Sequence, residues 1–127
     1  MDRLLLDAHT VIWWDSGSKL LGSSAVRAIQ NAAAVFVSAS SEWELAIKAG
    51  LGKVLLRRSI LQATLESGFE PLPVSFQHAQ AVRHLKPVHR DPFDRLLVAV
   101  AQVEGLTLVS SDPSLAQYPI QVIPARR

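Results

Sequence analysis

The chain of 127 residues is 49% hydrophobic and 19% charged, a composition that excludes an intrinsically disordered protein and favours one domain, residues 1–127, with a sizeable core. It contains no cysteine, which excludes disulfides and thiolate metal sites and favours a reducing, cytoplasmic location. The net charge of +2 permits a nucleic-acid partner without requiring one, and no apolar run is long enough to predict a membrane partner.

Strand and helix patterns alternate along the chain. Apolar runs predict strands over 3–6, 35–37, 71–74, 107–109 and 119–123, with 71–74 at a sheet edge because it contains two prolines. Helical periodicity and capping signals predict helices over 23–33, 42–49, 60–66, 76–85 and 92–104, a helix or packed loop over 11–14, and an extended connection over 52–56. This alternation predicts an α/β fold in which a mostly parallel sheet lies between helices.

The stretch 89–112 has the strongest local pattern. Asp91 is predicted to cap a helix that has Pro92 at its first position and Asp94 in its first turn, beside the positive end of the helix dipole. Asp112 comes just past the end of the next predicted strand. Because ligands in open α/β sheets bind beyond the carboxyl ends of the strands, we expect the chemistry at this edge.

Two further acids have related positions. Asp7 ends the first predicted strand, where a turn or cap role is equally expected. Glu42 and Glu44 flank the apolar face of helix 42–49 on opposite sides, so periodicity does not choose between them. Glu44 also has two ordinary explanations that outweigh a functional one, a capping box with Ser41 and a surface ion pair with Lys48. The face of this helix predicted to be buried consists of Trp43, Ala46, Ile47, Gly50 and Leu51.

Carboxylates that gather in one cleft repel each other, and burial penalises their charge further. A bound hard cation is the common resolution, and in a chain without thiolates the oxygen ligands favour Mg²⁺ or Mn²⁺. Such a cation activates water and neutralises charge on phosphate oxygens. The acids therefore indicate metal-dependent phosphoester chemistry.

Four segments together resemble PIN-domain proteins of the VapC type, the ribonuclease toxins of toxin–antitoxin pairs. They are LLLDAHTVIWW (4–14), SEWELAIKAGLGKV (41–54), HRDPFDRLLVAVAQVEGLTLVSSD (89–112) and the terminal apolar run near 120–123. The resemblance implies a single PIN domain with a three-layer α/β/α sandwich. It also implies a Mg²⁺-dependent endoribonuclease (with Mn²⁺ as an alternative ion), an RNA substrate, an antitoxin protein and a homodimer.

The resemblance also implies which residues form the site, and so favours Glu44 over Glu42. It matches Asp91 as a helix cap or accessory acid, and Ser110 as the hydroxyl two residues before the last acid. The family's acidic residues fall on Asp7, Glu44, Asp94 and Asp112.

Two positions depart from the family pattern. Ala8 stands where similar chains usually carry threonine after the first aspartate, and Ser110 stands where threonine is more usual. Thr10 is a candidate for the missing hydroxyl. Both departures concern hydrogen bonds around the acids and leave the acids themselves in place.

We hypothesise that Asp7, Asp94 and Asp112 bind the cation, that Glu44 completes the site, and that a metal-activated water attacks an RNA phosphodiester. A basic cluster before and after Asp91 is equally compatible with a grip on RNA and with a solvated surface. It consists of Arg83, His84, Lys86, His89, Arg90 and Arg95. The predicted RNA contacts in it are Lys86, Arg90 and Arg95.

Several aromatic side chains have more than one explanation. His9 fits a ligand or proton carrier, although a packing role is the commoner one for a histidine near an apolar run. Packing is also the commoner explanation than base stacking for Trp13, Trp14 and Trp43.

Two other functions compete with the nuclease. One is a catalytically silent module that keeps the fold for RNA or protein contact, and the presence of all four acids argues against it. The other is a phosphohydrolase that forms an aspartyl-phosphate on Asp7, but that chemistry usually needs an aspartate at the position that His9 occupies.

Overall fold

The computed structural model describes residues 2–54 and 56–126. In this part of the chain five strands form one parallel sheet in the order β3-β2-β1-β4-β5. Their bounds are β1 Arg3–Leu6, β2 Ala34–Ser38, β3 Glu70–Leu72, β4 Thr107–Ser110 and β5 Val122–Pro124. The first strand of the chain is therefore the centre of the sheet, where it pairs with β2 on one side and β4 on the other.

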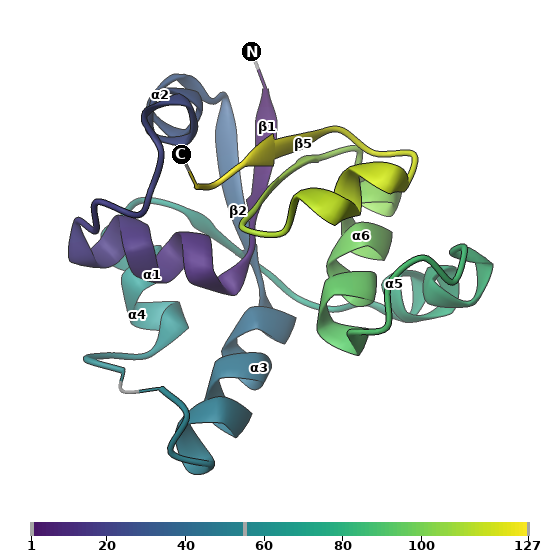
Figure 1. Ribbon diagram of the computed structural model, residues 1–127, viewed down its shortest axis with the longest axis horizontal. Helices are drawn as coiled ribbons and strands as arrows, with labels where there is room; N and C mark the ends of the chain where they lie inside the picture. Colours follow the sequence, from purple (N-terminus) through teal and green to yellow (C-terminus); the bar gives the residue numbers. More distant parts are fainter. Residues whose placement is uncertain (1, 55, 127) are drawn as a thin grey trace.

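Helices cover both faces of this sheet. They are α1 Ala8–Ser16, α2 Ser23–Asn31, α3 Ala39–Gly50, α4 Ile60–Glu66, α5 Phe76–Ala81 and α6 Pro92–Glu104, with short 3₁₀ helices η1 Val82–His84 and η2 Pro113–Gln117. Figure 1 shows α1, α2 and α4 on one side of the sheet and α5 and α6 on the other, while α3 extends beyond the sheet end. The predicted three-layer α/β/α arrangement is confirmed.

The core consists of two layers because successive residues of a strand point to opposite faces. Leu4 and Leu6 pack with residues of α1, α2 and α4, whereas Leu5 packs with residues of α6. All three leucines are completely buried. This explains why the central strand is a continuous apolar run and not an alternating one.

Most predicted elements are present, with shifted ends. The predicted strand 71–74 lies at the sheet edge as expected, but it pairs only over Glu70–Leu72. Helix 76–85 ends as α5 at Ala81 and continues as η1, and the last strand begins at Val122 instead of 119. The predicted extended connection 52–56 includes position 55, which lies outside the described residues, and its other residues form no strand.

The prediction for the buried face of α3 is wrong. Trp43, Ile47 and Leu51 are 60%, 40% and 65% exposed, and Ala46 and Gly50 are exposed as well. The buried residues of this helix are Ser40, Ser41, Glu44 and Leu45. Periodicity identifies which apolar residues share a face, but it does not say whether the chain itself supplies something to cover that face.

No helix in the described part of the chain is both long and apolar enough to cross a membrane.

Candidate metal centre

The predicted acids come together because parallel strands end at one edge of the sheet. Asp7 follows β1, Asp112 follows β4, and the helices α3 and α6 begin at the same edge with Glu44 and Asp94 in their first two turns. The separation between Asp7 and Asp112 along the chain is thereby closed by the pairing of β1 with β4.

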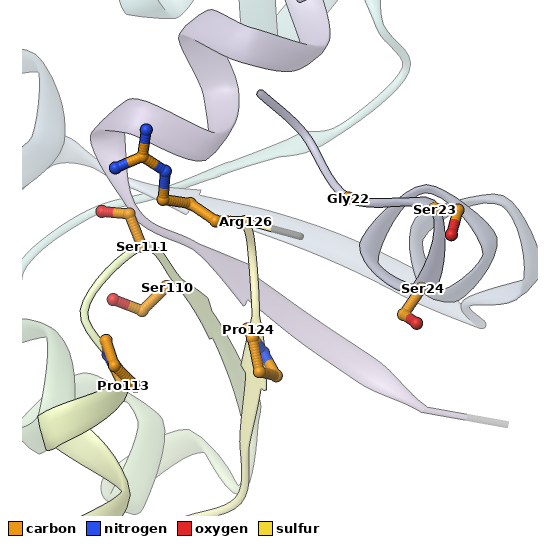
Figure 2. A pocket seen from close by; sticks show the side chains of 8 residues that line it. All are labelled: Gly22, Ser23, Ser24, Ser110, Ser111, Pro113, Pro124 and Arg126. Carbon is orange, nitrogen blue, oxygen red and sulfur yellow. The ribbon is translucent and has the colours of Figure 1, made fainter. Parts of the chain in front are cut away.

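Asp7 is buried and held by five hydrogen bonds. Its Oδ1 accepts from the Thr10 backbone N–H at 2.8 Å and from the Thr10 hydroxyl at 2.5 Å. Its Oδ2 accepts from the Ser110 hydroxyl at 3.0 Å, and from the Ser111 N–H at 2.9 Å and hydroxyl at 3.3 Å. Figure 2 shows both serines at the end of β4.

These contacts answer the question raised by Ala8. Thr10 donates the hydroxyl hydrogen bond to Asp7, three residues along the same helix, and Ser110 donates one from across the sheet. Five donors hold Asp7 as a fixed carboxylate. Because both oxygens are engaged, the arrangement disfavours Asp7 as an attacking nucleophile and so argues against the phosphohydrolase alternative.

Glu44 is 6% exposed and lies in the second turn of α3, not the first. The capping box with Ser41 is wrong because the helix begins at Ala39 and is capped by Ser38. The pair with Lys48 is present, with Nζ donating to Oε2 at 2.7 Å, and this bond is the main cause of the raised pKa of Lys48. Lys48 therefore partly compensates a buried carboxylate and is not ordinary surface support.

Glu42 has a different role on the same helix. Its carboxylate accepts hydrogen bonds from the backbone N–H groups of Ile60 and Leu61, at 3.1 and 3.2 Å, where α4 begins. Glu42 therefore ties α3 to the N-terminus of α4, while Glu44 lies buried on the other side of the helix.

Asp94 is the electrostatic focus of the cluster. Asp91 caps α6 as predicted, because its Oδ1 accepts from the N–H groups of Phe93 and Asp94 at 2.8 and 3.3 Å. The pKa of Asp94 is raised to about 7, first by burial and then by the neighbouring carboxylates of Asp91, Glu44 and Asp7, while His89 opposes the shift. Asp7 and Asp94 thus interact directly through their charges, as expected if they face one cleft.

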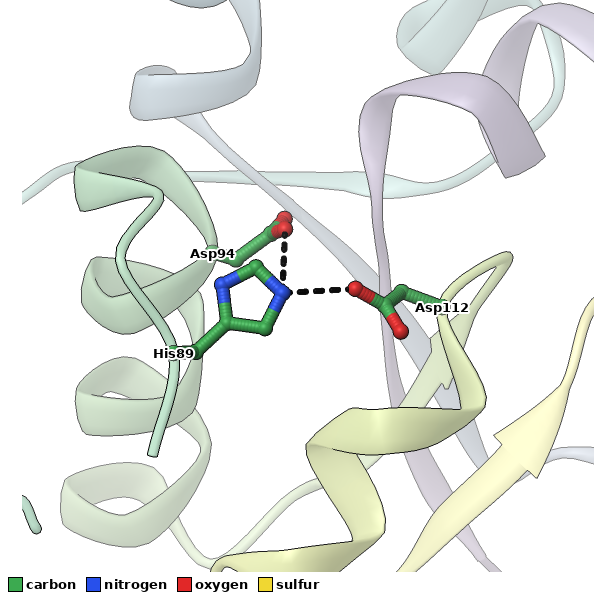
Figure 3. Close-up of side chains that lie close together, drawn as sticks. All are labelled: His89, Asp94 and Asp112. Atoms are coloured by element: carbon green, nitrogen blue, oxygen red, sulfur yellow. Dashed lines mark hydrogen bonds and ion pairs between the residues drawn. The ribbon is translucent and has the colours of Figure 1, made fainter. Parts of the chain in front are cut away.

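Asp112 completes the group together with a histidine (Figure 3). His89 Nε2 lies 2.7 Å from Asp112 Oδ2 and 3.8 Å from Asp94 Oδ2. Asp112 Oδ1 accepts from the Ser114 hydroxyl at 2.6 Å and from the Ser114 N–H at 2.9 Å. The Ser114 hydroxyl is the largest cause of the lowered pKa of Asp112.

Sequence reasoning placed His89 only in the basic cluster and missed its place in the centre. The Asp91 backbone N–H donates to His89 Nδ1 at 3.2 Å, which leaves Nε2 as the ring nitrogen that donates a hydrogen bond to Asp112 Oδ2. The signal available in the sequence was a histidine two residues before a capping aspartate. The loop conformation that turns it toward Asp112 has no periodic signature.

Two of the four predicted acids, Asp94 and Asp112, lie closer together than the other two. Among the described residues, His89, Asp94 and Asp112 each offer one ligand atom, and these atoms all lie within 4.8 Å of one another. Asp7 and Glu44 stand farther from this group but close enough to raise the pKa of Asp94.

A divalent cation fits this donor set. The centre holds oxygen donors and one imidazole, and burial together with the neighbouring carboxylates raises the pKa of Asp94 to about 7. A bound cation relieves the repulsion between these carboxylates. Asp94 and Asp112 are the residues that would hold it, and the carboxyl groups of Asp7 and Glu44 lie in the same electrostatic surroundings.

The basic residues beside the centre divide into two kinds. Arg95 donates from its guanidinium to the carbonyl oxygens of Lys86 and Val82, at 3.0 and 3.4 Å, and to the Tyr118 hydroxyl at 3.3 Å. Arg95 therefore organises the loop before α6. Lys86 and Arg90 are exposed at the surface of that loop.

The other aromatic candidates lie in different surroundings. His9 is exposed, and its ring is tilted relative to the Trp13 ring, with the two ring centroids 6.0 Å apart. The ring centroids of Trp14 and the core residue Phe69 are 5.7 Å apart. Trp43 is exposed and packs edge-on against Phe93, with the two ring centroids 5.0 Å apart.

The chain is similar in sequence to known proteins. The family model of the PIN domain matches residues 4–121. A relative, ribonuclease VapC22 of Mycobacterium tuberculosis, is 31% identical over 121 residues, which is 93% of each chain.

Solved structures show the same fold. The VapBC2 complex of Rickettsia felis bound to a promoter DNA fragment matches with a TM-score of 0.69 and 15% identity, over 96% of this chain and 98% of that one. VapBC-5 of Mycobacterium tuberculosis, a member of the VapBC family of toxin–antitoxin systems, matches with a TM-score of 0.61 and 22% identity over the whole of both chains.

Proposed function

Because this chain belongs to the PIN-domain family, as its resemblance to VapC-type proteins predicted, we propose that it is a Mg²⁺-dependent endoribonuclease and the toxin of a toxin–antitoxin pair. The observation that carries the nuclease proposal is the half-buried Asp94, whose pKa is raised to about 7 by burial and by three other carboxylates. Such uncompensated charge in a cleft is typical of a site that binds a cation. A relative named as a ribonuclease supports RNA as the substrate.

Each acid has its own part in this proposal. Asp94 and Asp112 hold Mg²⁺ or Mn²⁺, and Asp7 and Glu44 complete the site. Asp91 positions Asp94 by capping α6, and Ser110 holds Asp7 in place. When bound, the cation supplies a Lewis acid that neutralises charge on phosphate oxygens and lowers the pKa of water.

The chain's other groups position the acids and the substrate. His89 holds Asp112 through its Nε2–H, and Lys48 donates a hydrogen bond to buried Glu44 and so holds that carboxyl group in position. Lys86 and Arg90, exposed on the loop before α6, bind the RNA backbone electrostatically. Arg95, which was predicted as a third RNA contact, instead supports this binding through the loop that it organises.

An antitoxin partner follows from the family together with the exposed face of α3. Trp43, Ile47 and Leu51 are spaced four residues apart and form an apolar stripe on that face. Such a stripe suits the apolar side of a partner helix. The solved relatives are complexes of toxin with antitoxin, which supports the same partnership here. We also propose that the protein forms a homodimer and is located in the cytoplasm, as the sequence predicts.

A cleavage assay tests the proposed activity. Purified protein with Mg²⁺ is expected to cut RNA and to lose this activity in EDTA. Asp7→Asn and Asp94→Asn are expected to reduce the rate at least 100-fold, in the range that electrostatic groups contribute at active sites. Circular dichroism confirms that each variant is folded, and cleavage by either folded variant at the unmutated rate would contradict the proposal.

A further inference from the structure

A hollow of about 840 Å³ lies beside the candidate metal centre, and Figure 2 shows the side chains that line it. Its polar lining consists of the four serines 23, 24, 110 and 111 together with Arg126, and no carboxylate of residues 2–54 and 56–126 lines it. The cluster of acids next to it therefore has a neighbour of opposite charge.

The hollow and the metal centre share a wall. Ser110 and Ser111 line the hollow, and both donate hydrogen bonds to Asp7 Oδ2, at 3.0 Å from the Ser110 hydroxyl and 2.9 Å from the Ser111 N–H. An RNA strand that is bound at the metal centre and extends from Asp7 toward Ser110 and Ser111 would therefore reach the hollow.

Arg126 lies beside Ser111 on the same side of the hollow, as Figure 2 shows, and it is held in place there. Its backbone bridges to Leu21, and the neighbouring Ala125 carbonyl accepts from the Gly22 N–H at 2.7 Å. Its guanidinium lies over the Trp13 ring, 5.4 Å from the centroid. Arg126 lines the hollow, and none of the ion pairs among residues 2–54 and 56–126 involves it.

We infer that this hollow binds a backbone phosphate of the RNA substrate. This phosphate is adjacent, along the same strand, to the phosphate whose ester bond is cleaved. Arg126 supplies the cation, and the exposed hydroxyls of Ser23 and Ser24 supply hydrogen-bond donors. The inference rests on the proposed nuclease function. The proposed phosphate site explains why a hollow with hydroxyl groups and a cation lies beside an acidic centre. RNA is a polyanion, and positive charge next to the four carboxylates would offset their repulsion of it.

The test separates this subsite from the nuclease itself. Binding of a fluorescent single-stranded RNA is measured in EDTA across a series of salt concentrations, so that no cleavage is needed for the readout. Arg126→Gln is expected to weaken binding roughly tenfold. It should also reduce the slope of log affinity against log salt by about 0.7, the value for one phosphate of a single strand.

Two variants serve as controls. Arg27→Gln removes the same charge from an exposed position of α2 that does not line the hollow, and it is expected to leave binding unchanged. Arg126→Lys keeps the charge and is expected to preserve the salt slope. In cleavage assays with Mg²⁺, Arg126→Gln is expected to raise KM with kcat within about twofold, as for a residue that binds ground state and transition state equally.

Unchanged RNA affinity and salt slope in Arg126→Gln, with a protein that still cleaves RNA, would overturn the subsite and leave the nuclease intact. Loss of antitoxin binding with unchanged RNA binding would also overturn it, since the hollow would then serve a protein carboxylate. If the unmutated protein fails to cleave but Arg126→Gln still lowers the RNA affinity and slope, the phosphate site stands and the nuclease proposal fails.

Discussion

Asp94 shows how burial and neighbouring charge act on a single side chain. Its pKa is raised from an ordinary value of 3.8 to about 7, with burial the largest cause. The folded protein therefore binds a proton at this carboxyl more tightly than the unfolded chain does. The stability that the group contributes is full below pH 3.8 and is lost as the pH rises toward 7, because only the unfolded chain ionises freely in that window.

Removing this charge should stabilise the metal-free protein. Asp94→Asn in EDTA is expected to raise the free energy of unfolding at pH 8 by about 1–3 kcal/mol. The full linkage value is about 4 kcal/mol, but the variant also loses a favourable interaction with the dipole of α6. Urea unfolding at pH 8 and at pH 4 measures this, and little or no gain is expected at pH 4.

Asp112 provides the opposite case in the same centre. Its pKa is lowered, mainly by the hydrogen bond from the Ser114 hydroxyl, so ionised Asp112 favours the folded state. Asp112→Asn is therefore expected to reduce stability at pH 8. Equal changes in stability for the two variants would contradict the electrostatic description of both aspartates.

The residue scale also shows where sequence reasoning reached the site and where it stopped. The positions of Asp7 and Asp112 follow from strand ends, and Asp94 from a capping pattern, all of which are local signals. His89 reaches Asp112 across 23 residues of sequence through an irregular loop. No local pattern encodes that contact, because it depends on how the loop folds back over β4.

At the scale of elements, helix α3 contains two glutamates, Glu42 and Glu44, that have different roles. Glu42 accepts hydrogen bonds from the first N–H groups of α4, whereas buried Glu44 contributes to the charge around Asp94. Periodicity left these two residues equivalent because both flank the same apolar stripe. Burial separates them, and burial depends on tertiary packing that periodicity does not contain.

The two glutamates form a matched pair for mutation. Glu42→Gln is expected to lower the free energy of unfolding by about 0.5–1 kcal/mol, because the charge at the start of α4 is lost, and to leave RNA cleavage unchanged. Glu44→Gln is expected to keep the fold and reduce cleavage at least tenfold. Thermal unfolding and a cleavage assay on both proteins would refute the assignment if the two activities were reversed.

The exposed stripe of α3 separates partner binding from folding. Ile47→Lys is expected to change stability by less than about 0.5 kcal/mol, because the side chain is 40% exposed, and to weaken a complex with the antitoxin. Leu45→Ala, which truncates a side chain only 1% exposed on the same helix, is expected to cost about 2–5 kcal/mol. Strong destabilisation by Ile47→Lys would show that the chain itself buries this stripe.

At the scale of the whole molecule, the alternation of strands and helices was enough to predict a parallel sheet between two helical layers. The strand order was not predicted, because it requires β1 to pair with β4 across about a hundred residues while local patterns describe single elements. That pairing is what brings Asp7 to Ser110 and Ser111. The candidate centre is therefore a product of topology acting on acids whose positions are local.

The proposed cation site predicts that the protein's stability depends on divalent cations. A cation that binds the folded centre and not the unfolded chain stabilises by mass action, by about 2.7 kcal/mol at one hundred times its dissociation constant. Mg²⁺ or Mn²⁺ is expected to raise the melting temperature of the unmutated protein at pH 8. The melting temperature of Asp94→Asn should respond little to either cation, and an equal response of both proteins would place the ion elsewhere.

A calorimetric titration of Mn²⁺ into EDTA-treated protein tests the convergence of the acids most directly. The unmutated protein is expected to bind one ion per chain, and folded Asp94→Asn is expected to bind it at least tenfold more weakly. Binding of the ion by Asp94→Asn with unchanged affinity would contradict the proposed metal centre.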